Sequence, residues 1–243
     1  MIWFLLKKFL FDLWDNLFFI ALLNLGFLLF LALGIVLLSV LPTAPLILFF
    51  CYWFFVYFCA AVSVLMEASD YQRPNPADFI RNIKSALLPA AVFFSAAAFV
   101  FVVIRFTIPI YLKMETLMGL AAAFFSCWIC LFITASIQFY PAVYYRLGKR
   151  PLKSIKKCAI IFLDNTLFCL FTLFFSILLS IYILPFPGFP LLFLDEALRL
   201  RLLKYDWLET HSRKTKIPWH ELLAEEKENT GHRTLKSFIF PWH

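Results

Sequence analysis

Charge is scarce in this chain. Only 15% of its 243 residues are Asp, Glu, Lys or Arg, whereas 63% are hydrophobic, and the mean hydropathy is +0.85. So much apolar side chain cannot be accommodated in one soluble core, which predicts a protein solvated mainly by lipid. No reaction and no transported substrate follows from the composition.

The common signatures of catalysis and cofactor binding are also missing. The chain has no glycine-rich phosphate loop, no His-Glu-x-x-His helix and no Gly-x-Ser-x-Gly elbow. Cys127 and Cys130 have the spacing of a redox pair, but they lie mid-way along an apolar stretch, where coincidence explains them better. All four histidines follow residue 210, at spacings that match no usual zinc site. We therefore expect no enzyme, no cofactor and no metal.

Long apolar stretches dominate the chain instead. At about 1.5 Å of rise per residue, roughly 20 helical residues cross the roughly 30 Å hydrocarbon core of a bilayer. The pattern predicts an all-α fold, a polytopic transmembrane helical bundle of about five spanning helices, at residues 17–40, 46–66, 89–111, 117–140 and 159–184.

Amphipathic segments flank these spans. Residues 2–16 and 76–87 group their apolar positions on one helical face and their charges on another, which predicts helices lying in the membrane interface. In residues 191–205 a leucine stripe lies opposite Asp195 and Arg199, which are four residues apart and are predicted to pair with each other. We expect this helix to lie in the interface or against the bundle, with a half-crossing just before it as the alternative.

Positive charge is concentrated in one connector, between the fourth and fifth predicted spans. It contains six basic residues and no acid, so the positive-inside rule assigns it to the cytoplasm, together with the N-terminus. The net charge of +7 thus reflects membrane topology and not nucleic-acid binding. Basic residues near a membrane contribute about 1 kcal/mol each to binding anionic headgroups. The candidate headgroup contacts are Arg146, Lys149, Arg150, Lys153, Lys156 and Lys157.

A charged tail, residues 208–243, follows the predicted transmembrane domain of residues 1–207. Five crossings from a cytoplasmic N-terminus would leave this tail outside, yet basic residues just before it favour the cytoplasm, so the sequence leaves its side open. The tail ends on an apolar cluster after a charged stretch. This pattern predicts docking on the bundle or on a partner through Phe238, Phe240 and Trp242.

Polar residues inside the spans are the default candidates for function, because burial in lipid is costly. Four of them lie near the cytoplasmic ends of their helices, which predicts either a cytoplasm-facing polar cavity or ordinary hydrogen bonding between helices. Arg105, near the outer end of the third span, either extends its charge to the interface, contacts an anion, or pairs with Asp195 or Glu196. The candidate cavity residues are Asn24, Gln138, Asp164, Asn165 and Arg105.

Five short motifs within about residues 9–185 suggest a relationship. They are Asp15-Asn16-Leu17, Leu22-Leu23-Asn24-Leu25, Leu41-Pro42-Thr43-Ala44-Pro45, Asp78-Phe79-Ile80-Arg81 and Phe139-Tyr140-Pro141-Ala142. Together they resemble the YesL-like bacterial membrane proteins (domain of unknown function 624). The chain departs from that pattern at Ala44, where the family often has glycine, and in its long charged tail. The resemblance implies a bacterial inner-membrane protein of about five helices, linked to carbohydrate uptake and breakdown, and it supplies no functional residues.

Two functions remain. The first is an accessory or scaffold subunit of another membrane complex, such as a solute transporter, in contact with membrane lipids. The alternative is a small transporter or channel with a hydrated path. Five spans cannot form two equal halves, so no inverted repeat supports the alternative.

Overall fold

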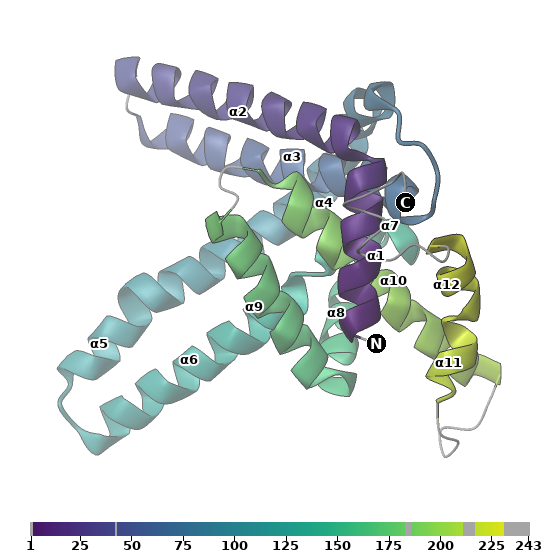
Figure 1. Cartoon of the computed structure of the whole chain (residues 1–243). Coiled ribbons are helices and arrows are strands. Elements are labelled where there is room, and N and C mark those ends of the chain that lie inside the picture. Colours follow the sequence, from purple (N-terminus) through teal and green to yellow (C-terminus); the bar gives the residue numbers. More distant parts are fainter. Residues whose placement is uncertain (1, 42, 183–185, 211–216, 231–243) are drawn as a thin grey trace.

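The computed structural model describes residues 2–41, 43–182, 186–210 and 217–230 (Figure 1). Within these ranges the chain forms helices joined by short turns, which confirms the all-α expectation. Four helical stretches are long and apolar enough to cross a membrane, and a bent pair of helices could count as a fifth. The protein is thus built as a multi-pass membrane protein.

The first hairpin consists of α2 (Leu17–Val40) and α3 (Ala44–Ser69), which run side by side (Figure 1). Its helices are close because Gly34 has no side chain: a Cβ there would lie 3.1 Å from the ring of Phe50. At the other end of the hairpin, the Tyr57 hydroxyl donates a hydrogen bond to a backbone carbonyl of α2. The bounds of α2 coincide with the first predicted span.

The second hairpin diverges from the first and extends to the lower left of Figure 1. One arm is a continuous helical stretch, and the other has a two-residue turn before its last seven residues. Their elements are α4 (Pro76–Val102), a π-helical turn (Val103–Thr107), α5 (Ile108–Lys113), α6 (Leu117–Ile137) and α7 (Tyr140–Arg146).

The structure joins two elements that the sequence kept apart. The predicted interfacial helix 76–87 and the predicted span 89–111 form one helical stretch, Pro76–Lys113, with Pro89 in its interior. A proline removes one backbone hydrogen bond, but a helix in a bundle tolerates this loss when its neighbours hold it in place. Pro89 is buried, so packing overrides its tendency to end the helix.

The predicted fifth span, 159–184, is wrong as a single helix. The chain forms α8 (Pro151–Asp164) and α9 (Thr166–Tyr182), bent by 105° at Asn165. The Asn165 side-chain amide donates hydrogen bonds to the Ile161 carbonyl and to the hydroxyl of Tyr205, so a polar contact with α10 fixes the bend. α8 is amphipathic and α9 carries the apolar half of the stretch.

The core of the molecule is α10 (Gly188–Thr210), which crosses between α1 (Ile2–Asp15), α3 and α9 (Figure 1). Several of its apolar side chains, among them Leu192 and Leu198, are completely buried. This settles the position of the predicted helix 191–205: it packs inside the bundle and not on its surface. The Gly188 amide at its start donates to the buried Asn24 side chain of α2 at 3.0 Å.

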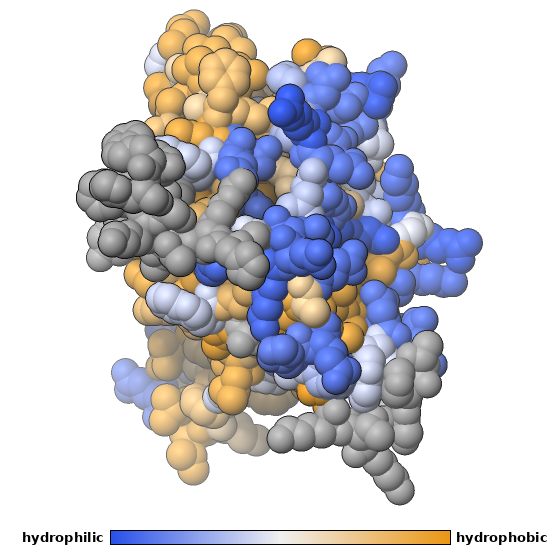
Figure 2. All heavy atoms as spheres, turned by 45° about the vertical axis from the view of Figure 1, so that its right-hand side comes forward, coloured by the Kyte–Doolittle hydropathy of each residue, from blue (hydrophilic) through white to orange (hydrophobic). Residues whose placement is uncertain are grey.

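Two short helices, α11 (Trp219–Leu222) and α12 (Ala224–Thr230), lie at the far end of α10. In Figure 2 the molecule is turned so that this end comes forward. Hydrophilic residues cover much of the face that it shows, and hydrophobic residues gather towards the left. The molecule therefore has a polar end opposite its apolar hairpins.

Candidate functional site: a buried charge cluster

Five elements meet at the polar end, and their charged side chains form one network. Five carboxyl groups and three cations take part, from α1, the turn after α3, α7, α10 and α12. We refer to this set as the charge cluster: Lys8, Asp12, Asp70, Arg146, Asp195, Glu196, Arg199 and Glu226.

The best-formed pair of the cluster joins α7 to α10. Arg146 donates from Nε to Asp195 Oδ1 at 2.9 Å and from Nη2 to Oδ2 at 2.7 Å, so the pairing is bidentate. Arg146 also reaches Asp70 at 3.1 Å and the Ser69 hydroxyl at 2.6 Å. The Asp195 side chain is 0% exposed, and a buried carboxylate of this kind needs the guanidinium for its charge.

Arg199 joins α10 to the end of α3 and to α12. Its Nη1 donates to the Ser69 carbonyl and to Asp70, and Nε donates to Glu226 at 2.9 Å. The predicted pairing of Asp195 with Arg199 is therefore wrong: each of them finds a partner on another helix. Asp70 lies between Arg146 and Arg199 and accepts from both.

Lys8 and Asp12 bring α1 into the cluster. The amphipathic pattern predicts both on the water-facing side of an interfacial helix, but the Lys8 side chain is completely buried. Lys8 donates to Asp12 and, at 3.2 Å, to the Ser69 carbonyl, and its ammonium lies 4.0 Å from the ring centroid of Tyr71. Burial lowers the pKa of Lys8, but the neighbouring acids Glu196 and Asp12 raise it by a larger amount, so the net shift is upward and Lys8 stays charged.

Glu196 is the unusual member. It is completely buried, no donor among the described residues reaches its carboxyl oxygens, and its carboxyl group lies beside that of Asp12. Burial and the nearby Asp12 carboxylate raise the pKa of Glu196 well above its ordinary value. We assign the proton of this pair to Glu196 and the negative charge to Asp12, because Lys8 donates to Asp12.

A cavity of about 180 Å³ lies between α3, α4, α9 and α10 and reaches Asp195. Most of its lining is apolar. Two polar oxygens in its wall, Gln138 Oε1 and Ser176 Oγ, are buried and have no hydrogen-bond partner among the described residues. The arrangement can therefore hold water or a small molecule that donates and accepts hydrogen bonds.

The structure does not collect the predicted cavity residues into one polar layer. Asn24 accepts from Gly188 at the start of α10, whereas Asn165 donates to Tyr205 near its end. Seventeen residues of helix, about 25 Å at 1.5 Å per residue, separate these two contacts. Each asparagine thus makes an ordinary hydrogen bond between two helices, which is the second of the two predicted alternatives.

The remaining predicted polar residues also separate. Gln138 donates to the Cys169 carbonyl at 2.9 Å and is the one that lines the cavity. Asp164 is exposed, 3.8 Å from Lys204. Arg105 is exposed in the π-helical turn and its nearest ring is that of Phe106, so the proposed pairing with Asp195 or Glu196 is wrong.

The predicted headgroup contacts divide in two groups. Arg146 is taken into the charge cluster, and Lys157 is half-buried and donates to the Leu147 carbonyl at 3.2 Å. The others are exposed and available to headgroups: Lys149, Arg150, Lys153 and Lys156. The predicted docking residues Phe238, Phe240 and Trp242 lie outside the described residues.

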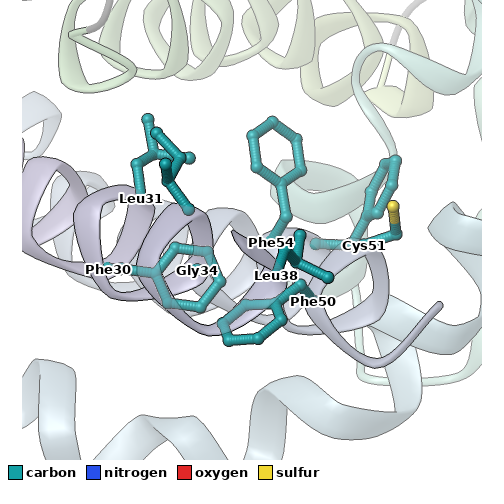
Figure 3. Close-up of a pocket in the computed structure, with 9 residues that line it drawn as sticks. Phe30, Leu31, Gly34, Leu38, Phe50, Cys51 and Phe54 are labelled. Carbon is teal, nitrogen blue, oxygen red and sulfur yellow. The ribbon is translucent and has the colours of Figure 1, made fainter. Parts of the chain in front are cut away.

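A separate hollow of about 400 Å³ lies between α2 and α3, around Gly34 (Figure 3). Aromatic and aliphatic side chains of both helices enclose it, and it offers no ionisable group apart from a thiol. Its lining residues are Phe30, Leu31, Gly34, Ile35, Leu38, Phe50, Cys51, Phe54 and Phe55. In a membrane, such a surface is suited to acyl chains.

Among the described residues, no three His, Cys, Asp or Glu side chains are grouped so that they could hold a metal ion. Comparisons with known protein families, curated proteins and solved structures find no match to this chain. The resemblance to the YesL-like proteins therefore stays a prediction.

Proposed function

We propose that this protein is a non-enzymatic accessory or scaffold subunit of another membrane complex, such as a solute transporter. The observation that carries the proposal is how little the spans bury within their own chain. In the most apolar window of each span, only 17% to 33% of the residues are buried inside the protein. Helices with so few contacts to their own chain offer their surfaces to lipid or to other transmembrane helices.

The hairpin of α5 and α6 illustrates this surface best. Phe124 and Trp128, one turn apart on α6, are 66% and 56% exposed, and their rings lie 6.1 Å apart. The hairpin diverges from that of α2 and α3, whereas a transporter that works alone encloses its path among its helices (Figure 1). The polar end supports the same role, because a buried charge cluster holds five elements in a fixed arrangement.

The location proposed is the bacterial inner membrane, with the N-terminus in the cytoplasm. The exposed basic side chains of α8 and of the turn before it follow α7, whose Arg146 belongs to the same charge cluster as Lys8 of α1. The N-terminus and these basic residues therefore share one side of the membrane, and the positive-inside rule assigns that side to the cytoplasm.

Photo-crosslinking in intact membranes tests the accessory role. A photoreactive residue in place of Phe124 or Trp128 should give one protein adduct of constant mass, identified by mass spectrometry as a membrane protein. Ala123, which its own chain buries, is the control position and should give none. The identified complex should also disassemble in native gels when this protein is deleted. Adducts with lipid alone at both exposed positions would contradict the proposal.

The tail is tested separately. If the C-terminal apolar cluster docks on the partner, removal of residues 238–243 should abolish co-purification of the complex identified above. Co-purification of the same complex in the same yield would show that the tail takes no part.

The cavity beside Asp195 supports a second candidate function, a small transporter. Ser176→Ala and Gln138→Leu would each remove an unpartnered oxygen from the wall of the cavity. Uptake of a panel of mono- and disaccharides into proteoliposomes should then fall. If the unchanged protein gives no uptake above that of empty liposomes, this alternative is rejected.

A further inference from the structure

Glu226 of α12 occupies a complete carboxylate-binding site. Arg199 lies against Oε1, with Nε at 2.9 Å and Nη2 at 2.8 Å, and the Tyr71 hydroxyl donates to Oε2 at 2.7 Å. The Lys8 ammonium lies 3.9 Å from Oε2. Both carboxylate oxygens therefore have donors, and the Glu226 side chain is only 5% exposed.

The three donor residues are held in place without help from α12. The Tyr71 ring lies between two cations, 4.0 Å from Lys8 Nζ and 5.1 Å from Arg199 Cζ. Its backbone adopts a φ of +59°, in the left-handed region, and its amide donates to the Ala68 carbonyl at the end of α3. Lys8 and Arg199 are both anchored on the Ser69 carbonyl. A site of this kind is organised before its ligand arrives.

The occupant, by contrast, belongs to a peripheral segment. α12 has seven residues, and in residues 217–230 only Leu223, Glu226 and Thr230 are buried. The hydroxyl of Thr230 donates to the backbone carbonyl of Glu226 itself at 2.6 Å. Among the described residues, Glu226 supplies the ion pairs that join this segment to the body.

We propose that Lys8, Tyr71 and Arg199 form an oxyanion-binding site, that Glu226 is its internal occupant, and that an external carboxylate or phosphate group takes its place when α12 leaves. A guanidinium, an ammonium and a hydroxyl converging on one point suit both groups. The site lies against α1, a helix predicted to lie at headgroup depth. The phosphate of an anionic lipid is therefore the favoured source, and free phosphate is the other. This site does not depend on the accessory role.

Chemical labelling of Lys8 tests the first half of the proposal. The full-length protein in phosphatidylcholine nanodiscs is treated with an amine-acetylating reagent, and each lysine is quantified by mass spectrometry, with the exposed Lys153 as reference. Glu226→Gln weakens the occupant, so the rate at Lys8 relative to Lys153 should rise at least tenfold. Glu225→Gln, the same change on the neighbouring exposed residue, should leave Lys8 unreactive.

The second half is tested by adding an anion to Glu226→Gln. Protection of Lys8 by inorganic phosphate in phosphatidylcholine nanodiscs identifies a free anion as competent. Protection only in nanodiscs that contain phosphatidylglycerol identifies the lipid headgroup. Tyr71→Phe keeps the ring between the cations and removes one donor, so in the otherwise unchanged protein it should give an intermediate rate at Lys8. The proposal is overturned if Lys8 stays unreactive in both Glu226→Gln and Tyr71→Phe, or if it reacts and neither anion protects it.

Discussion

The pairing of Arg146 with Asp195 should dominate the stability of the charge cluster. Replacing Arg146 with Met leaves a completely buried carboxylate with the Ser69 hydroxyl as a donor but without its bidentate cation. Breaking a buried ion pair from one side costs about 3–5 kcal/mol. At about 2–4 °C per kcal/mol for a chain of this size, the melting temperature should fall by about 6–20 °C. Removing both charges, in Arg146→Met with Asp195→Leu, should restore most of this loss, since no charge is then buried alone.

Thermal unfolding of the purified protein in mild detergent, followed by circular dichroism, measures the effect. Arg150→Met is the matched control, because it makes the same change at an exposed side chain of the same connector. Surface substitutions usually change stability by less than about 0.5 kcal/mol, so the control should shift by no more than about 2 °C. Equal melting temperatures for Arg146→Met and Arg150→Met would refute the reasoning.

Three further expectations concern the cluster and α10. Because the pKa of Glu196 is raised in the folded protein, stability should fall as pH rises above its unfolded pKa of about 4.3. Glu196→Gln should remove this fall, so its melting temperature should change less between about pH 5 and 8. Parallel curves of melting temperature against pH for the variant and the unchanged protein would contradict this. Asn24→Leu leaves the first amide of α10 without its acceptor, so it should cost about 1–3 kcal/mol in the same unfolding assay, and an unchanged melting temperature would show that water replaces the contact. Single cysteines in place of Lys153 and Glu228 should react from the same side of sealed vesicles, and labelling from opposite sides would contradict the contact between α12 and α1.

Hydropathy located the long helices because their composition is uniform: α2 is apolar almost throughout, and Asn24 is its one buried polar side chain. The same average failed at Asn165, which interrupts a long apolar window together with Asp164. The bend there depends on the hydroxyl of Tyr205, forty residues later, and no local pattern contains that contact. Likewise Pro89 reads as a helix boundary, and only its burial against the bundle keeps the helix continuous.

The charge cluster was partly visible in the sequence and was misassigned. Lys8 and Asp12 on α1, and Asp195 and Arg199 on α10, are each four residues apart, and this local spacing predicts charges on the exposed face of each helix. The partners of Asp195 and Arg199 lie 49 and 129 residues away, at Arg146 and Asp70. One signal could have found them: α10 is too charged to cross a membrane and too rich in leucine to stay in water, so its charges must pair inside the protein.

The contacts of the charge cluster also place α12 on the same side of the membrane as α1. Lys8 precedes the first candidate span, Asp70 follows two of them and Arg146 follows four, and Glu226 lies within reach of Lys8. Residues in contact share one side of a bilayer, so the chain between Arg146 and Glu226 must leave and return on that side. The bend at Asn165 and the return of α10 to the cluster make this possible without a fifth complete crossing. The basic residues of α10 then lie on the same side as those of α8, as the positive-inside rule requires.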